Sequence, residues 1–363
     1  MKTILRLILL FLGIVLIALI CYVAYVFLTY YRVEDNLPLE VEETGAEVQQ
    51  AAAGETYRLL SYNIGFGAYS DDYSFFMDGG KESRARSKEA VYENVGGAMS
   101  TVQAAAPDFV FLQEVDVEGT RSYHVDEYAY ACTYLPDLGE RVFAQNYDSP
   151  YLFWPILEPH GANRAGQVTF SRYDISSALR RSLPIEEGFM KLVDLDRCYS
   201  VSRIPLDNGH ELVLYNFHLS AYTSDGTIAE DQLKMLFADM SKEYAAGNYA
   251  IAGGDFNKDI LGNSDEIFGV SGEAYTWAQP IPAELVPSEL TIVAPFDEAS
   301  PVPSCRNADR PYGPDNYQVT VDGFIVSANV TVEEAAVIDT GFQWSDHNPV
   351  YLDFALKDGS ALD

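Results

Sequence analysis

Basic residues are scarce in this sequence. The 363 residues include 23 Lys and Arg against 54 Asp and Glu, which gives a formal net charge of −31 at pH 7. Proteins that coat nucleic acid draw their affinity from clustered Lys and Arg that neutralise phosphates. The composition therefore excludes a broad nucleic-acid-binding surface and a general DNA coat protein.

Cysteine is also rare, with four residues in the whole chain. Three of them, Cys132, Cys198 and Cys305, lie outside the N-terminal apolar run. An odd number allows at most one internal disulfide and leaves one thiol over. Disulfides are therefore not the scaffold of the fold, and core thiols acting as small hydrophobes explain the three equally well.

Long hydrophobic runs are absent except for one at the N-terminus. Residues 7–29 contain no charged side chain, and a helix of this length covers about 35 Å, enough to span a bilayer core of roughly 30 Å. Lys2 and Arg6 precede the run, and the positive-inside bias places residues 1–6 in the cytosol and the rest of the chain outside. We therefore expect a single-pass protein of the cell membrane, with a cleaved signal peptide as the alternative.

The rest of the chain divides into a short segment, one large domain and a tail. Residues 30–54 are acidic, small and aperiodic, which indicates a stalk that lifts the domain off the lipid. Residues 55–356 alternate β-branched or aromatic runs with helical stretches, without an internal repeat, and residues 357–363 form the tail. All 54 acidic residues but only 20 basic ones follow Val33, so this part carries a net charge of −34.

Hydrophobic periodicity indicates many strands and few helices. Strands are predicted at YRLLSYNI, DFVFLQEV, GQVTFSR, CYSVSRIPL, HELVLYNFHL, NYAIAGGDF, YQVTVDGFIVS, VTVEEAAVI and NPVYLDF, and helices at Ser87–Ala105 and Thr227–Tyr244. Apolar residues make up 48% of the chain, enough for a large core. The pattern predicts an α/β fold, a four-layered sandwich of two packed mixed β-sheets flanked by helices, in addition to the transmembrane helix.

Polar side chains interrupt several of these apolar runs. The interruptions are Asn63, Glu114, Asn216 with His218, Asp255 with Asn257, Asp322, and Asp346 with His347. Ligand groups of open α/β folds collect at the C-terminal ends of strands. Each residue alone is typical of a turn or a cap. Together they supply the carboxylates, amides and imidazoles that a Mg²⁺ site attacking a phosphate ester needs.

The ordered motifs SYNI, LQEV, NFHL, GGDFN, VDGFIVS and SDHNPV resemble the endonuclease/exonuclease/phosphatase superfamily. That superfamily includes deoxyribonucleases, abasic-site endonucleases, neutral sphingomyelinases and inositol-polyphosphate phosphatases. The resemblance spans nearly the whole chain after the apolar run. Two softer matches are GQVTFSRYDI, which contains Arg172, and Arg197 before CYSVSRI. The resemblance implies a metal-dependent phosphoesterase.

The resemblance also implies a role for each matched residue. Glu114 would be the principal carboxylate ligand of one or two Mg²⁺ ions, or of Mn²⁺ in their place, with Asn63 and Asp346 contributing. His347 would be the general base, and Asp322 would orient it. The groups that position the nucleophile or contact phosphoryl oxygens would be Asp255, Asn257, His218 and Asn216, with Arg197 and Arg172 binding substrate.

Nucleic acid, lipid head groups and small phosphate esters all suit this chemistry. His218 favours the deoxyribonuclease, sphingomyelinase and phosphatase branches, because abasic-site endonucleases depart from the pattern at this residue. The acidic charge favours a substrate with few phosphates, such as a lipid head group, a short nucleic acid or a small phosphate ester. An extracellular deoxyribonuclease and a non-catalytic binding module of the same fold are the alternatives.

Two further features concern basic groups and the remaining histidines. The run KESRARSK, from Lys81 to Lys88, is either a solvated helix start or a loop that gathers a phosphorylated head group. His124, His160 and His210 match no motif and are interpreted as surface or structural residues.

Overall fold

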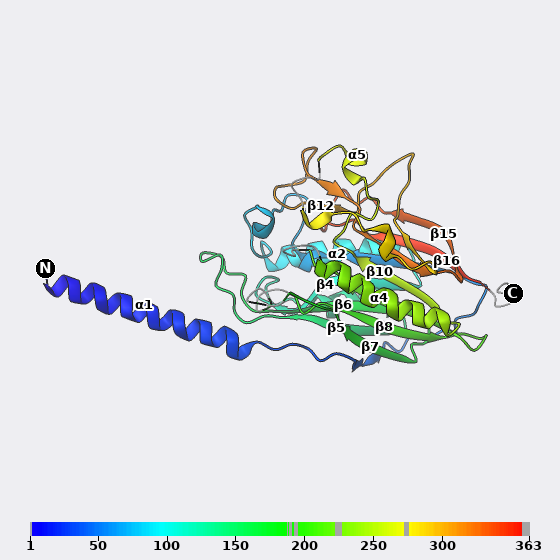
Figure 1. Ribbon diagram of the computed structural model, residues 1–363, viewed down its shortest axis with the longest axis horizontal. Helices are drawn as coiled ribbons and strands as arrows, with labels where there is room; N and C mark the ends of the chain where they lie inside the picture. Colours follow the sequence, from blue (N-terminus) through cyan, green and yellow to red (C-terminus); the bar gives the residue numbers. More distant parts are fainter. Residues whose placement is uncertain are drawn as a thin grey trace.

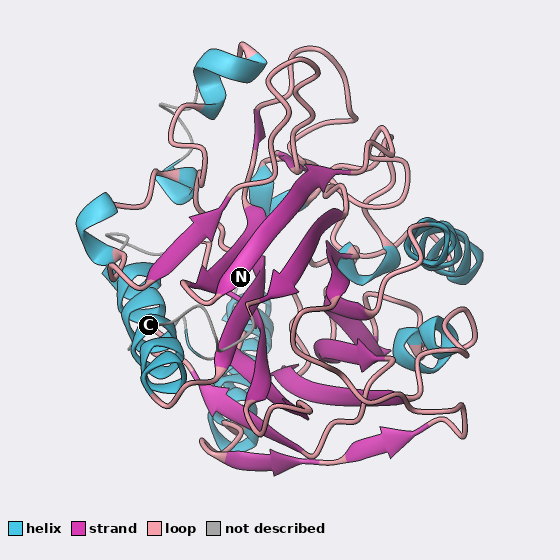
Figure 2. Cartoon of the chain, turned by 90° about the vertical axis from the view of Figure 1, so that its right-hand side faces the viewer, coloured by secondary structure: helices cyan, strands magenta, loops and turns pink. Residues whose placement is uncertain are grey.

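Two stacked sheets form the body of the computed structural model, as Figure 1 and Figure 2 show. The structure describes residues 2–186, 188, 191, 195–221, 227–271 and 276–357, so the predicted tail lies outside it except for Lys357. Sheet A contains, in spatial order, β1 (Leu37–Leu39), β7 (Ser177–Ser182), β8 (Cys198–Pro205), β9 (Glu211–His218), β10 (Tyr249–Asp255), β14 (Asp322–Ser327) and β11 (Leu290–Val293). Sheet B contains β15 (Val330–Val337), β16 (Val350–Leu356), β3 (Thr56–Asn63), β4 (Phe109–Gly119), β6 (Asn163–Ser171), β5 (Glu140–Asp148) and β2 (Val41–Glu43).

Helices cover the outer faces of both sheets, which makes four layers (Figure 2). The helices are α1 (Lys2–Thr29), α2 (Lys88–Ala104), α3 (Glu127–Cys132), α4 (Thr227–Ala245) and α5 (Ser264–Phe268). Helices α2 and α3 pack on sheet B, and α4 packs on sheet A. A small ribbon of β12 (Cys305–Arg306) and β13 (Gln318–Val319) lies beside them. The predicted four-layered α/β sandwich is confirmed.

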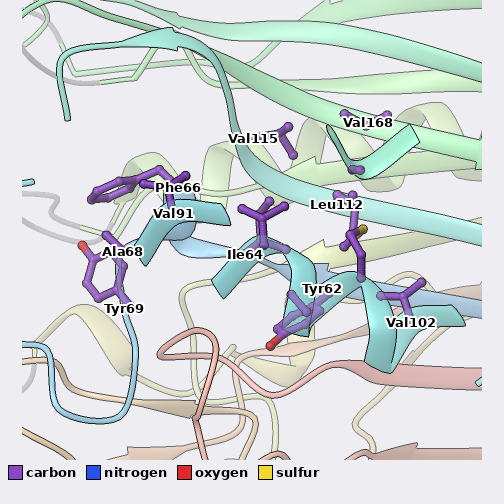
Figure 3. Close-up of a cluster of buried hydrophobic side chains, with 14 of the residues drawn as sticks. Tyr62, Ile64, Phe66, Ala68, Tyr69, Val91, Val102, Leu112, Val115 and Val168 are labelled. Carbon is purple, nitrogen blue, oxygen red and sulfur yellow. The ribbon is translucent and has the colours of Figure 1, made fainter. Parts of the chain in front are cut away.

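Strands β3 and β4 are apolar on both faces because each face is covered. Tyr62 and Leu112 point toward α2, where they meet Val102 in the cluster shown in Figure 3. The alternate residues Leu59 and Phe111 point the other way, into the core between the two sheets. Helix α2 begins where the Ser87 hydroxyl accepts a hydrogen bond from the Ala90 N–H, which caps the first turn.

Two parallel strand pairs fix where the polar side chains meet. Strand β3 runs parallel to β4, with Asn63 opposite Gln113, and β9 runs parallel to β10, with His218 opposite Asp255. Both pairs end at the same edge of the sandwich as Asp322, which is opposite Asp255 on the antiparallel strand β14. Parallel strands bring their carboxyl ends to one edge, so residues from distant parts of the chain share a site there.

The segment predicted as a free stalk, residues 30–54, is instead packed on the domain from Val33 onward. Strand β1 pairs with β7 and β2 pairs with β5, which adds one edge strand to each sheet. The guanidinium of the buried Arg180 donates hydrogen bonds to the carbonyl oxygens of Val33 and Glu34. The physical reason is the apolar side chains of Leu39 and Val41, which pack against the core between the sheets.

Helix α1 is long and apolar enough to cross a membrane. It projects from one end of the body in Figure 1, and Val26 is its one buried residue within the described part of the helix. The structure therefore agrees with the sequence on the existence of this segment.

Candidate active site

The polar side chains gather at one end of the space between the two sheets. Along β3 and β10, every second residue faces this space, and the series ends on Asn63 and Asp255. Gly254 allows β10 to pass close to β9: its φ is +153°, and a Cβ atom there would lie 1.9 Å from the carbonyl oxygen of Phe217. The glycine therefore permits the close strand pairing that brings Asp255 beside His218.

His347 and Asp322 form a buried hydrogen-bonded pair. His347 Nδ1 lies 2.8 Å from Asp322 Oδ2, and it must donate because a carboxylate only accepts. The Ser304 hydroxyl donates to the same carboxylate oxygen at 2.7 Å. Burial opposes protonation of the imidazole, yet the negative charge of Asp322 raises the pKa of His347 well above its ordinary value. The pairing leaves His347 Nε2 directed at the neighbouring groups.

Asp255 lies between the two histidines predicted for the site. Its Oδ2 atom is 3.4 Å from His218 Nε2 and 3.8 Å from His347 Nε2. Oδ2 also accepts a hydrogen bond from the side-chain amide of Asn63 at 3.1 Å, and Oδ1 accepts one from the backbone N–H of Asn257 at 2.8 Å. Burial raises the pKa of the Asp255 carboxyl to about 7. The same burial, with the charge of Arg197, holds the pKa of His218 well below its usual range.

Glu114 and Asp346 bring two carboxylates to the same region. Glu114 sits at a β-bulge in β4 with φ of +55°, a conformation that non-glycine residues rarely adopt and that is frequent next to active sites. Asn63 Nδ2 donates to Glu114 Oε1 at 3.2 Å. Burial raises the pKa of Asp346 to about 6, and the nearby charge of Glu114 acts in the same direction. Two partly buried carboxylates, one of them held by an amide, supply the oxygen ligands that suit a hard divalent cation.

A second group of side chains also satisfies the distances for a metal site. Ligand atoms of Asp255, Asp322 and His347 all lie within 4.8 Å of one another. In this structure His347 Nδ1 and Asp322 Oδ2 are already hydrogen-bonded to each other. The geometry of these three residues therefore suits two roles, metal binding and proton transfer.

A cavity of about 170 Å³ opens onto these groups. The residues predicted from the sequence that line it are Glu114, His218, Asp255, Asn257, Asp346, His347 and Arg197. Asn63 and Asp322 lie behind this layer and hold Glu114 and His347 through the hydrogen bonds given above. Most of the predicted site residues are thus brought together in one place.

Two of the predicted residues lie elsewhere. Asn216 is buried between the sheets, where its amide nitrogen donates to the carbonyl oxygens of Leu112 and Val168, so it links strands rather than facing the cavity. Arg172 lies at the other end of β4, where it pairs with Asp108 at 3.3 Å. The expected placement of Arg172 beside the substrate is therefore corrected, because the Ser-Arg end of β6 turns away from the site.

The basic run from Lys81 to Lys88 also contributes no residue to the cavity wall. Arg84 pairs with Glu158 at 3.3 Å, and Arg86 pairs with Asp72 and Glu82. These ion pairs hold residues 81–87 as a loop, and α2 begins only at Lys88. The run is therefore neither the solvated helix start nor the phosphate-gathering loop that the sequence suggested.

Other residues that line the cavity were missed by the sequence analysis. The unpredicted lining residues that carry charge or a titratable group include Arg121, Arg306, His160 and Cys305. Arg121 pairs with the buried Asp116 at 2.8 Å and lies 4.0 Å from the centre of the Phe66 ring. His160, interpreted from the sequence as a surface or structural residue, is a buried structural residue of this wall, and its Nδ1 donates to the Ser83 carbonyl oxygen at 2.7 Å. None of these residues interrupts an apolar strand, so periodicity gave no signal for them.

The chain belongs to the Endonuclease/Exonuclease/phosphatase family, whose model matches residues 60–347. Members of this family are hydrolases that act on phosphoester bonds. No curated protein matches the sequence.

Solved structures show the same fold at low sequence identity. A family member from Beutenbergia cavernae DSM 12333 has a TM-score of 0.57 and 18% identity over 83% of this chain and 72% of its own. ANGEL2, described as a 2′,3′-cyclic phosphatase and bound to adenosine-2′,3′-vanadate, has a TM-score of 0.54 and 15% identity over 89% of this chain and 99% of its own. A family protein from Bacteroides thetaiotaomicron has a TM-score of 0.53 and 14% identity over 84% of this chain and 99% of its own.

Proposed function

We propose that this chain is a Mg²⁺-dependent phosphoesterase whose catalytic domain lies outside the cell, anchored by α1. The observation that carries the proposal is the 2.8 Å bond between His347 and Asp322 beside a cavity that Glu114 and Asp346 also line. This arrangement combines a base with its orienting carboxylate and an acidic cluster next to it, which together suit hydrolysis of a phosphate ester.

The acidic cluster fits a divalent cation by the chemistry of its donors. Glu114 and Asp346 would hold the ion, and Mn²⁺ would suit the same oxygen ligands. Asn63 would position Glu114 through its amide nitrogen, because its amide oxygen accepts a hydrogen bond from the Gly65 N–H at 3.0 Å. The upward shift of the Asp346 pKa, caused by burial and by Glu114, supports the assignment because a cation would relieve it. When bound, the cation supplies Lewis acidity to a phosphoryl oxygen and a positive charge that disfavours the imidazolium form of His347.

The residues of the chain account for the proton transfer and the charge stabilisation. His347 accepts a proton from the attacking water at Nε2, while Asp322 keeps the other ring nitrogen protonated and fixes the ring. Asp255 and Asn257 orient the nucleophile. His218 and Arg197 face the cavity and interact with the phosphoryl oxygens as negative charge develops.

The cavity favours a substrate that presents one or a few phosphates. Three buried arginines, Arg121, Arg197 and Arg306, line this cavity of about 170 Å³. A phospholipid head group, a short oligonucleotide and a small phosphate ester all meet this condition.

Paired substitutions in the full-length protein test the assignment. His347→Asn and Asp322→Asn should each lower the hydrolysis rate of a small phosphodiester by on the order of 100-fold or more. Glu114→Gln removes an anionic ligand at nearly constant volume, so the Mg²⁺ concentration needed for half-maximal rate should rise.

Matched substitutions outside the cavity control for general damage. His210 is exposed, and Glu118 is an exposed acidic residue on the same strand as Glu114. His210→Asn and Glu118→Gln should therefore retain the wild-type rate and Mg²⁺ dependence. If His347→Asn were as active as His210→Asn, the assignment of the general base would be wrong.

A further inference from the structure

The loop between β5 and β6 carries a concentrated group of exposed apolar side chains. Residues 150–157 read PYLFWPIL and contain no charge. The exposed side chains are Phe153 at 54%, Trp154 at 65%, Ile156 at 75% and Leu157 at 98%. Within the described residues outside α1, the other large exposed apolar side chains are scattered singly. A gathered apolar group of this kind marks a site of contact with a membrane or a protein.

This loop lies against the C-terminal part of α1. The Tyr22 hydroxyl donates to the Tyr151 carbonyl oxygen at 3.1 Å, and the Tyr151 N–H donates to the Tyr25 hydroxyl at 3.2 Å. The rings of Tyr22 and Phe153 meet edge to face, with their centroids 4.9 Å apart. Figure 1 shows the loop extending from the body on the same side as α1. Its apolar tip is therefore continuous with the apolar surface of the helix.

The position of the contact along α1 determines how deep the loop lies in the membrane. About 20 helical residues cross a bilayer core, so a core that begins at Leu7 ends near Val26. Tyr22 and Tyr25 then lie in the leaflet nearest the domain, close to the interface where tyrosine and tryptophan concentrate. A side chain that touches Tyr22 lies at the same depth, whichever side of the membrane the domain occupies.

The backbone of the loop is suited to an apolar environment because part of it is internally hydrogen-bonded. Leu152 and Gly161 exchange two backbone hydrogen bonds of 3.0 Å, the Glu158 N–H donates to the Pro155 carbonyl oxygen at 3.2 Å, and the His160 N–H donates to the Trp154 carbonyl oxygen at 3.2 Å. These bonds reduce the number of unsatisfied backbone groups that the loop carries toward the lipid, where each such group is costly.

We propose that this loop inserts into the leaflet nearest the domain and holds the active-site cavity at the membrane surface, so that the substrate is the head-group phosphodiester of a membrane lipid. A bilayer is the occupant that explains both the apolar tip and its contact with α1. The link to the cavity is His160, which lies in the same loop after the apolar residues 150–157 and lines the cavity wall. The substrate part of this inference rests on the proposed phosphoesterase function, and the insertion part does not.

Trp154 reports insertion directly in the full-length protein reconstituted in phosphatidylcholine nanodiscs. Phosphatidylcholine brominated on its acyl chains should quench part of the tryptophan fluorescence, and Trp154→Leu should remove that quenched part while keeping the tip apolar. Trp277 and Trp344 remain in both proteins, so the difference isolates Trp154. Quenching of Trp154 by aqueous iodide and not by brominated lipid would overturn the insertion.

Activity on two substrates tests the consequence for catalysis. A variant with Phe153, Trp154, Ile156 and Leu157 replaced by serine should hydrolyse soluble bis(p-nitrophenyl) phosphate at the wild-type rate. On phosphatidylcholine in proteoliposomes its rate should fall by about tenfold or more, because the cavity is no longer positioned at the head groups. Val332→Ser, which changes an exposed apolar residue elsewhere, should leave both rates unchanged.

The outcomes separate the two proposals. If the wild type hydrolyses neither substrate, the phosphoesterase function fails while the fluorescence result still decides the insertion. If the serine variant loses both rates equally or neither, the role of the loop in presenting lipid is wrong. If the serine substitutions abolish a detergent-resistant dimer of the full-length protein and Trp154 is not quenched by lipid, the loop binds a second copy of the chain and the proposal is overturned.

Discussion

At the scale of single residues, burial determines how the titratable groups of the cavity behave. Burial raises the pKa of the carboxyls of Asp255 and Asp346 to about 7 and about 6, and it lowers the pKa of the His160 imidazole to about 4. In each case the charged form is disfavoured because it loses its hydration. Neighbouring charges then give otherwise similar residues different pKa values. In His347 the negative charge of Asp322 raises the pKa by more than burial lowers it.

Burial of His160 makes the free energy of unfolding depend on pH. The unfolded chain takes up a proton on this residue near pH 6.5, whereas the folded protein resists doing so until about pH 4. The unfolded state therefore binds more protons between these values, so the contribution of His160 is present above pH 6.5 and is lost as the pH falls toward 4. A shift of this size corresponds to about 3 kcal/mol in the free energy of unfolding.

His160→Asn keeps a donor for the Ser83 carbonyl oxygen and removes the titration. Urea unfolding of the full-length protein in detergent, followed from pH 7 to pH 4, should show the stability difference between wild type and variant change by about 3 kcal/mol in favour of the variant. His210→Asn, at an exposed position, should show the same change in unfolding free energy with pH as the wild type. If the difference in unfolding free energy between wild type and His160→Asn stayed constant with pH, the expected effect of burial on His160 would be contradicted.

The sequence predicted the site residues that lie in apolar strands or next to them. Asn63, His218 and Asp255 stand out because each ends an apolar series, and the structure brings them together. Arg121 reaches the same cavity from a turn and Arg306 from the two-residue strand β12. The positions of both depend on packing that no local pattern encodes. The placement of Arg172 was wrong for the related reason that a short motif does not fix which end of a sheet it occupies.

At the scale of elements, the predictions succeeded where both faces of a strand are apolar. The runs that became β3, β4, β9 and β10 are rich in apolar side chains that are buried on both faces. Helices α2 and α4 begin and end within about two residues of the predicted ranges. Strand β7 was missed because its sequence, SALRRS, has two arginines and no apolar alternation. Its buried Arg180 is satisfied by hydrogen bonds that only the folded chain provides.

The edge strands β1 and β2 give a prediction that distinguishes a packed segment from a free stalk. Protease that cleaves after glutamate should cut slowly at Glu40, Glu42 and Glu43 in the native full-length protein, because these residues lie in or beside paired strands. Replacing Leu37, Leu39 and Val41 with serine should release the segment and make cleavage there fast. Rapid cleavage of the wild-type segment would instead support the free stalk.

At the scale of the whole molecule, charge and fold act in opposite directions on an anionic substrate. The part of the chain after Val33 carries a net charge of −34, so its long-range field repels a polyanion. The cavity wall nevertheless contains Arg121, Arg197 and Arg306, all buried. The surface arginines Arg84 and Arg86 are paired with acidic residues. Binding is therefore expected to depend on a few phosphates inside the cavity.

This balance predicts that duplex DNA of many base pairs competes only weakly with a small substrate. Each phosphate that a protein neutralises on DNA adds about 0.9 to the steepness of the log affinity against log salt. Because the arginines expected to meet phosphate are buried in the cavity wall, DNA should inhibit hydrolysis of bis(p-nitrophenyl) phosphate weakly at moderate salt. The slope should report only one or two phosphates. Tight inhibition with a slope that corresponds to many phosphate contacts would mean that local basic groups overcome the net charge, and a surface deoxyribonuclease would then become the better assignment.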